Sequence, residues 1–318
     1  MPTLLLSKDV IRGLLNIADV IKVVEDAFKL FDQGRASMPP KAYLAVEQGD
    51  FRAMPASIPG AAGMKWVNSH PQNPSRGLPT VMAVLVYNDP ETGYPLAVMD
   101  ATDITAYRTA ATSAIASKYL ARPDSHVLGI IGAGHQAYIH ILAHAEVFDL
   151  KLIKVFDHSM STCERLICSL PDYPVEKASL EDTANADIIC TLTPSREPIL
   201  KKEWITPGTH INAVGADAAG KEELDPSILK DSIVVVDDLR QASAAGEINV
   251  PITQKLFTVD EVYATLGELI TGKKQGRTDN DVTSIFDSTG IAIEDIATAK
   301  LIYEKAKHAG SGMSIELI

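Results

Sequence analysis

The segment VLGIIGAGHQAYIHILAHAEV, residues 127–147, carries the strongest structural signal in this sequence. Its apolar run 127–131 leads into GAGHQA, residues 132–137, which fits the pattern G-x-G-x-x-G/A, and a helical pattern follows. Gly132 permits a tight turn, and Gly134 lets the backbone approach a pyrophosphate. The N–H groups and the positive dipole at the helix N-terminus favour bound phosphate. The stretch therefore predicts a strand, a turn and a helix that bind a dinucleotide; the alternative is a tight structural turn in another kind of α/β domain.

An acidic residue at the end of the next strand favours the dinucleotide interpretation. The run KVFD, residues 154–157, ends in Asp157, which stands 23 residues past Gly134. At that spacing a carboxylate accepts hydrogen bonds from the adenosine ribose. Asp157 also favours NAD over NADP, because it would repel a 2′-phosphate, although the neighbouring His158 could offset that repulsion.

Further apolar runs continue the same rhythm along the chain. We expect strands at residues 127–131, 153–156, 188–191, 210–214 and 233–236. Apolar β-branched runs that alternate with helical segments are typical of a parallel sheet covered on both faces. The fold class is therefore α/β, with a Rossmann-type doubly wound parallel sheet domain.

The N-terminal part of the chain has a different texture. Proline and glycine interrupt its short apolar runs, and two of these, at 81–87 and 95–99, flank a turn sequence, which predicts a mixed or antiparallel sheet. An alanine-rich helix is expected over 102–120 and a last helix over 293–307, long enough to return to the first domain. We therefore expect two domains with these boundaries: a discontinuous α+β domain of residues 1–121 with 296–318, and an NAD-binding Rossmann domain of residues 122–295.

Composition excludes several classes of protein. The 318 residues carry 29 Lys+Arg against 41 Asp+Glu, a net charge of −12, which argues against binding to a nucleic-acid backbone. No apolar run approaches the ~18 residues of a membrane span, and the N-terminus lacks a basic segment of the secretory type. Three cysteines suit a reducing cytosol, so we expect a cytoplasmic protein. No metal site is expected, because Cys163 and Cys168 have no matched second pair.

Charged residues in apolar surroundings are the candidates for chemistry. In the N-terminal part these are Lys41, Arg52, Lys65 and Arg108. A guanidinium can hold a carboxylate with two hydrogen bonds, and a lysine near other cations or in an apolar pocket can transfer protons near neutral pH. Each cation alone could equally be a surface residue whose stem lies on apolar surface. Asp217 follows an expected strand, where it is either a catalytic carboxylate or a residue of a local turn.

Taken together, these motifs resemble the ornithine cyclodeaminase/mu-crystallin family. The segments that carry the resemblance run in order along the chain: KWVNSHP (65–71), GLPT (77–80), DAT (100–102), RT (108–109), GAGHQA (132–137), VGADAAGK (214–221) and DSTG (287–290). The segments MPPKAYL, FRAMPA, MKWVNSHP and FDSTG are most similar to the archaeal alanine dehydrogenase branch of that family.

The resemblance implies a homodimer formed through the N-terminal domains, NAD as the cofactor, and oxidative deamination of an L-amino acid. It implies that Arg52 grips the substrate carboxylate, that Lys65 donates and accepts protons at the reacting carbon, and that Asp217 handles water or amine. Resemblance to the alanine dehydrogenase branch alone implies that Lys41 is a further substrate-pocket residue. The first domain is thus expected to be the substrate-binding and dimerisation domain. The cofactor contacts that it implies are Thr80, Arg108, Gly132, Gly134, His135, Gln136, Asp157, either Thr191 or Thr193, Val214, Gly215, Ala216, Lys221 and Ser288.

The segment between two of these cations bears on the substrate. Residues 53–64, AMPASIPGAAGM, contain no acid. Ornithine carries a distal ammonium that a cyclodeaminase must neutralise, since a buried unpaired charge is costly. We therefore expect a small apolar substrate such as L-alanine, converted reversibly to pyruvate and ammonia.

Three alternatives stay open. They are an ornithine cyclodeaminase that forms proline and ammonia, a cyclic imine or ketimine reductase, and a non-catalytic binder of reduced cofactor or hormone. The presence of Arg52, Lys65 and Asp217 argues against the last, because a pure binder needs no acid–base groups. Accumulation of NADH with alanine would separate a dehydrogenase from a cyclodeaminase.

Overall fold

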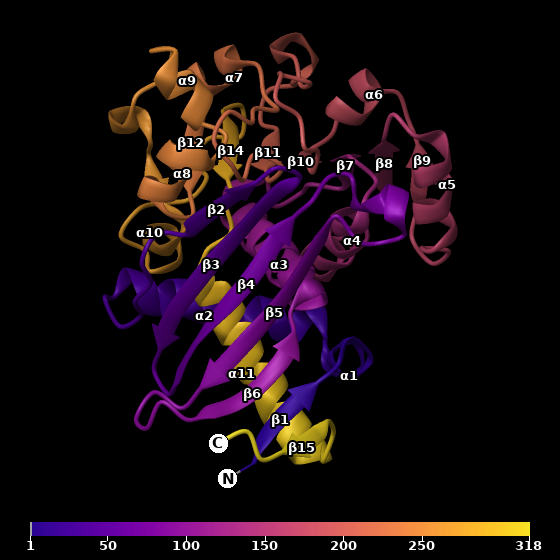
Figure 1. The fold of residues 1–318 in the computed structure, drawn as a ribbon. Coiled ribbons are helices and arrows are strands. Elements are labelled where there is room, and N and C mark those ends of the chain that lie inside the picture. The colour runs from indigo at the N-terminus through magenta and orange to yellow at the C-terminus, as the bar shows by residue number, and fades with distance from the viewer. Residues whose placement is uncertain (1) are drawn as a thin grey trace. The chain divides into compact units, whose positions relative to one another are not determined.

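A computed structural model describes residues 2–318. The chain divides into two compact units (Figure 1). Unit 1 comprises the chain up to Thr109 together with Ile291–Ile318, and unit 2 comprises Ala110–Gly290. No helix in residues 2–318 has the length and apolar character needed to cross a membrane.

Unit 1 is built on a seven-stranded sheet in the order β15-β1-β6-β5-β4-β3-β2. Strands β2 to β6 pair antiparallel with their neighbours, as the turn-rich sequence predicts, whereas β1 pairs parallel with β6. The strands are β1 (Thr3–Leu6), β2 (Ala42–Val46), β3 (Gly49–Ile58), β4 (Ala61–Ser69), β5 (Val81–Asn88), β6 (Pro95–Asp100) and β15 (Met313–Ile315). The helices are α1 (Lys8–Leu14), α2 (Ile17–Asp32), the short η1 (Asn73–Arg76), the start of α3 (Thr102–Leu120) and α11 (Ala292–Ala309).

Helix α11 covers one face of this sheet. It packs against β3, β4 and β5 and against α2, whose apolar stripe includes the buried residues Val20, Val24 and Phe28. The spacing of these residues along α2 is that of one helix face. A helix from the end of the sequence thus completes the core of the first unit, as the last helix was expected to do.

Unit 2 is built on an eight-stranded sheet whose pairings are all parallel, in the order β13-β12-β14-β11-β10-β7-β8-β9. Its strands are β7 (Val127–Ile131), β8 (Leu152–Phe156), β9 (Val175–Lys177), β10 (Ile188–Thr191), β11 (His210–Ala213), β12 (Ser232–Val236), β13 (Ala264–Thr265) and β14 (Thr283–Asp287). The helices are the rest of α3, α4 (His135–Val147), α5 (Met160–Cys168), α6 (Leu180–Ala184), η2 (Lys202–Trp204), α7 (Pro226–Lys230), α8 (Leu239–Ala245), α9 (Asn249–Thr253), η3 (Val259–Glu261) and α10 (Leu266–Ile270).

The strand order of unit 2 confirms the expected doubly wound fold. From β7 the sheet grows outward through β8 and β9 on one side and through β10, β11 and β14 on the other. The order in which successive strands are added to the sheet therefore reverses between β7 and β10. Ligands of such sheets bind at this switch point, beside the carboxyl ends of the strands. Apolar clusters fill both sides of the sheet.

Two buried histidines attach α4 to α3 within unit 2. The Nε2 atoms of His140 and His144 lie 3.2 and 3.0 Å from the hydroxyls of Ser113 and Ser117. Each Nδ1–H donates to the backbone carbonyl four residues earlier, so each Nε2 accepts from its serine. Burial lowers the pKa of His140 to about 3 and that of His144 to about 4, so both rings are neutral at pH 7. This neutral network fixes the helix that begins at the glycine-rich turn.

The units divide at places that differ from the expected boundaries. The divisions fall after Thr109 and after Gly290, whereas we expected them after residues 121 and 295. The first falls inside α3, because this small-residue helix is buried along most of its length and its first residues pack in unit 1. The second falls before α11, because the first turn of α11 packs in unit 1 together with the rest of that helix.

Candidate functional site

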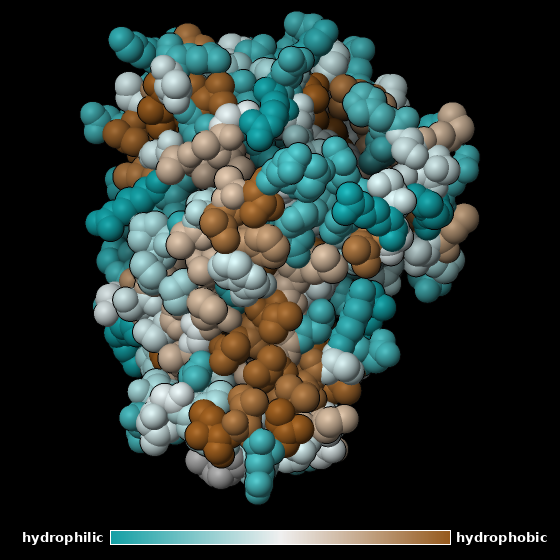
Figure 2. All heavy atoms as spheres, viewed as in Figure 1, coloured by the Kyte–Doolittle hydropathy of each residue, from teal (hydrophilic) through white to brown (hydrophobic). Residues whose placement is uncertain are grey.

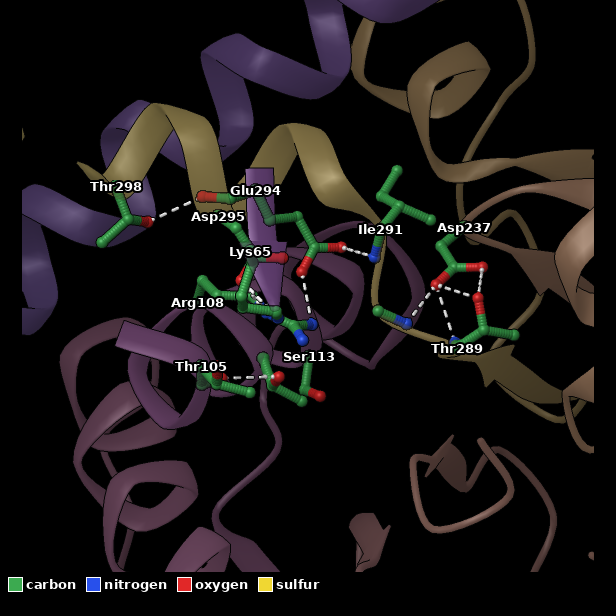
Figure 3. Close-up of polar contacts among 12 residues, drawn as sticks. Lys65, Thr105, Arg108, Ser113, Asp237, Thr289, Ile291, Glu294, Asp295 and Thr298 are labelled. Atoms are coloured by element: carbon green, nitrogen blue, oxygen red, sulfur yellow. Dashed lines mark hydrogen bonds and ion pairs between the residues drawn. The ribbon is translucent and has the colours of Figure 1, made fainter. Parts of the chain in front are cut away.

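Lys65 lies in the buried interior of unit 1. It is in β4 opposite Met54 of β3 and Leu85 of β5, and its side chain is fully buried. Its Nζ atom donates to Oδ1 of Asp295, in the first turn of α11, at 2.7 Å (Figure 3). The contact joins residues 230 positions apart in the sequence.

Arg108 joins the same carboxylate from α3. Its Nε donates to Oδ1 of Asp295 at 3.0 Å, and its Nη1 donates to Oε2 of Glu294 at 2.8 Å. Lys65, Arg108, Glu294 and Asp295 thus form a buried cluster of two cations and two anions, which we call the buried charge cluster. Two of the cations predicted from the sequence therefore meet at one carboxylate that was not predicted.

The surroundings of Lys65 favour its neutral form. Burial and then the positive charge of Arg108 lower the pKa of Lys65 to about 7, although Asp295 acts in the opposite direction. Lys41, just before β2, adds a further lowering influence. An amine with such a pKa exchanges protons near neutral pH, which is the property expected of a general acid or base.

Arg52 shares the buried face of the sheet with Lys65. It lies in β3 opposite Val67, two positions along the ladder from the pair of Met54 and Lys65. Its guanidinium donates to both carboxylate oxygens of Asp50, at 2.7 and 3.3 Å, and lies over the ring of Tyr43, 5.3 Å from its centroid. The group is thus set in the forked geometry with which it binds a carboxylate. Thr80 lies in the loop before β5, where its carbonyl accepts from the His70 N–H.

The glycine-rich turn of unit 2 has the predicted geometry. Gly132 has φ +100°, and a Cβ there would lie 3.0 Å from the Leu192 carbonyl oxygen, so the turn requires glycine. A Cβ on Gly134 would meet no protein atom within 4 Å. Asp157 follows β8 and accepts from the Ala133 N–H at 2.9 Å, which ties the acid to the turn.

These residues fit a dinucleotide. Gly134 and His135 are exposed at the N-terminus of α4, where backbone N–H groups are available to phosphate. A hollow of about 290 Å³ lies beside them, lined by Ala133, Gly134 and His135 and by residues of α5. The Oε1 atom of Gln136 is buried with no hydrogen-bond partner among the described residues. The turn therefore offers donors, space and a spare acceptor.

A buried carboxylate organises the next two loops at the same edge of the sheet. Glu223 accepts from the side chain of Thr191 at 2.6 Å, from the side chain and N–H of Thr193 at 2.7 and 2.8 Å, and from the Gly215 N–H at 2.9 Å. Burial raises the pKa of Glu223, and these four donors oppose that effect. One side chain thus joins the loops that follow β10 and β11, and both threonines that the sequence left open bind it.

The remaining predicted residues follow β11 and β14. Val214, Gly215 and Ala216 form the loop after β11, and this loop carries an ion pair of 2.6 Å between Asp217 and Lys221. Ser288 follows β14, and its hydroxyl is buried with no hydrogen-bond partner among the described residues. Because parallel strands end at one edge, the structure gathers these positions at the edge that carries the glycine-rich turn.

Sequence reasoning missed three buried carboxylates that bind predicted site residues: Glu223, Glu294 and Asp295. The sequence does contain a signal for Glu294 and Asp295. In IAIEDIA, residues 291–297, two acids interrupt a buried small-residue helix, and acids in such surroundings need cationic partners. The expected boundary also placed them in the other domain, where no pairing with Lys65 would have been sought.

Replacement of Glu223 by Gln should loosen both loops. The amide keeps one acceptor oxygen, but its NH2 group faces N–H and hydroxyl donors that then lack an acceptor. We expect this to lower the free energy of unfolding by about 1–3 kcal/mol. We expect a lower urea midpoint and faster hydrogen exchange at the Thr193 and Gly215 amides. Glu222→Gln is the matched control, because Oε1 of Glu222 has no partner among the described residues. Equal exchange rates in wild type and Glu223→Gln would contradict the assignment.

Comparison with known proteins shows the family of this chain. It is 48% identical to the alanine dehydrogenase of Archaeoglobus fulgidus over 99% of both chains. It superposes with a TM-score of 0.98, at 48% identity and full coverage of both chains, on an archaeal alanine dehydrogenase dimer with bound NAD. The Δ(1)-pyrroline-2-carboxylate reductase of Thermococcus litoralis, in complex with NADH and L-proline, matches at 37% identity and a TM-score of 0.95, over 98% of this chain and 100% of that one. The family model matches residues 1–310, and the chain belongs to the ornithine cyclodeaminase/mu-crystallin family.

Proposed function

We propose that this protein is an NAD-dependent amino-acid dehydrogenase that converts L-alanine and water reversibly to pyruvate and ammonia. The observation that carries the proposal is the 48% identity, along the whole chain, to an alanine dehydrogenase. The buried charge cluster supports it, since Lys65 has the proton affinity that acid–base chemistry at the amino group needs. NAD, when bound, accepts the hydride from the substrate Cα.

We assign substrate-binding and proton-transfer roles to residues of unit 1, and most cofactor contacts to residues of unit 2. In unit 1, Arg52 holds the substrate carboxylate, with Lys41 as a further pocket cation, and neutral Lys65 takes a proton as the amino acid becomes an imine. In unit 2, Asp217 assists the water that attacks the imine. In unit 2 the cofactor is held by the glycine-rich turn, by Asp157, by the loops that Glu223 joins, and by Lys221 and Ser288. In unit 1 we assign cofactor contacts to Thr80 and Arg108. The expected division into a substrate domain and a cofactor domain is part of this proposal.

We also propose a location and an oligomeric state for the protein. We place it in the cytoplasm, and the three free thiols of Cys163, Cys168 and Cys190 support this location. For the assembly we propose a homodimer formed through unit 1. The face of its sheet opposite α11 exposes the side chains of Leu44, Met64, Trp66 and Val84. Figure 2 shows hydrophobic residues gathered over the strands of unit 1 on this side. Exposed apolar side chains that adjoin one another on one face are typical of a protein interface.

Substrate choice can be tested by the absorbance of NADH. Alanine with NAD should accumulate NADH, and pyruvate with ammonia should consume it. The rate of deamination should rise with pH through about 7, because Lys65 acts as a base when neutral. Lys65→Ala should lower kcat by about 10²–10⁴-fold while NADH binding, followed by fluorescence, persists. Lys22→Ala, at an exposed position of α2, is the matched control.

Other outcomes would replace the proposal. Ammonia and proline from ornithine without accumulated NADH would indicate a cyclodeaminase, and faster oxidation of NADH by a cyclic imine than by pyruvate with ammonia would indicate a reductase. Turnover by Lys65→Ala at the wild-type rate would exclude the role of Lys65.

The preference for NAD should depend on Asp157. Replacement by Ser removes the charge that repels a 2′-phosphate, so the ratio of kcat/KM for NADP to that for NAD should rise at least about tenfold, an energy of about 1.4 kcal/mol. Asp149→Ser, which removes an exposed acid that follows α4, should leave the ratio unchanged. A constant ratio in Asp157→Ser would refute the assignment of the ribose contact.

The dimer can be tested at Val84, which is half exposed on β5. Light scattering should give twice the 34.2 kDa of one chain for the wild type. Val84→Lys should shift the mass toward one chain, because a buried charge without a partner opposes association. Leu239→Lys in unit 2, at another exposed apolar position, should stay dimeric. A dimeric Val84→Lys protein would move the interface away from this face.

A further inference from the structure

The carboxylate of Asp295, beside Lys65, is arranged differently from those of two nearby buried acids, Asp237 and Glu294. Asp237 accepts from the backbone N–H groups of Thr289 and Gly290, and Glu294 accepts from the N–H of Ile291, so these acids also hold backbone segments in place. The hydrogen bonds of Asp295 come instead from two cationic side chains, both to Oδ1, and its Oδ2 has no partner among the described residues. Its role is thus directed at Lys65 and Arg108 rather than at the fold of the backbone.

Among the charged groups around Lys65, Asp295 has a distinct electrostatic effect. Lys65 faces Arg108 from α3, Lys41 from the segment before β2, and Asp295 from α11, while its neighbours on β3 and β5 are apolar. Among these influences Asp295 is the one that favours the ammonium form. When Lys65 loses its proton, the net charge of the buried charge cluster changes from zero to −1.

We propose that Asp295 is the positioning residue of Lys65: its Oδ1 holds the Lys65 amine at one place and supplies the negative charge against which Lys65 gains and loses its proton. The inference rests on the proposed function, in which Lys65 exchanges a proton with the substrate amino group. It deepens that function, because it assigns the working pH range of the reaction to a residue of the returning C-terminal helix.

Asp295→Asn tests this assignment with little change of shape. Without the carboxylate charge, burial, Arg108 and Lys41 all act against the ammonium form. The midpoint of the rise of kcat/KM with pH, in the direction of alanine deamination, should therefore move down by about 1–3 pH units. The sign is specific, since loss of a merely structural contact lowers the rate without moving the midpoint.

Glu294→Gln is the matched control. It removes an equal charge one residue away and breaks the other ion pair of Arg108, but Glu294 makes its contact with Arg108 and not with Lys65. Its midpoint should stay at least one pH unit above that of Asp295→Asn, with a comparable loss of thermal stability. Equal midpoints in the two variants, or an unchanged midpoint in Asp295→Asn, would overturn the proposal.

Asp295→Glu keeps the test valid if the amide variant does not fold. The charge is retained but displaced by one methylene, so the midpoint should remain near that of the wild type while kcat falls at least about tenfold, because the amine is no longer held in place. Wild-type kcat in this variant would overturn the positioning role. Absence of alanine turnover in the wild-type protein would instead refute the proposed function, so the two failures are distinguishable.

Discussion

The buried ion pair between Lys65 and Asp295 constrains how the main elements of unit 1 pack together. Both side chains are fully buried, and a buried charge without a partner costs several kcal/mol. The strand that carries Lys65, the helix that carries Arg108 and the helix that carries Asp295 must therefore all be in place at once. The antiparallel sheet, the small-residue helix α3 and the covering helix α11 are the framework that satisfies this requirement.

Unit 2 uses buried carboxylates for a different purpose. Glu223 and Asp237 accept mainly from backbone N–H groups and threonine hydroxyls of the segments that follow β10, β11 and β14. Backbone groups in such loops have no strand or helix partners, so their conformation depends on these hydrogen bonds. The parallel sheet brings the loops to one edge, and the acids then hold them in their detailed conformation. In unit 1 a carboxylate sets a proton affinity, whereas in unit 2 carboxylates set backbone shape.

Much of this architecture could be predicted from the sequence because its signals are local. The strands at 127–131 and 188–191 and the helix at 102–120 were predicted at their observed bounds, since apolar runs, glycine and small residues act over a few positions. The short strands β1 and β15 were not predicted, because a strand of three or four residues forms only beside a partner that is distant in the sequence. The same reason hid the partner of Lys65. A cation in apolar surroundings indicates that an acid must lie nearby, but only the folded structure shows that this acid is Asp295.

The path of the chain through the two units also orders the events of folding. Unit 2 is one continuous segment, whereas unit 1 combines the beginning of the chain with its last residues. During synthesis from the N-terminus, the strands that surround Lys65 emerge first but lack α11, so the positive charges of Lys65 and Arg108 have no buried counter-charge. Unit 2 has all its own residues before α11 leaves the ribosome. The unit whose synthesis begins first is therefore completed after unit 2, and the buried environment of the Lys65 amine forms only in a chain that has been synthesised beyond α11.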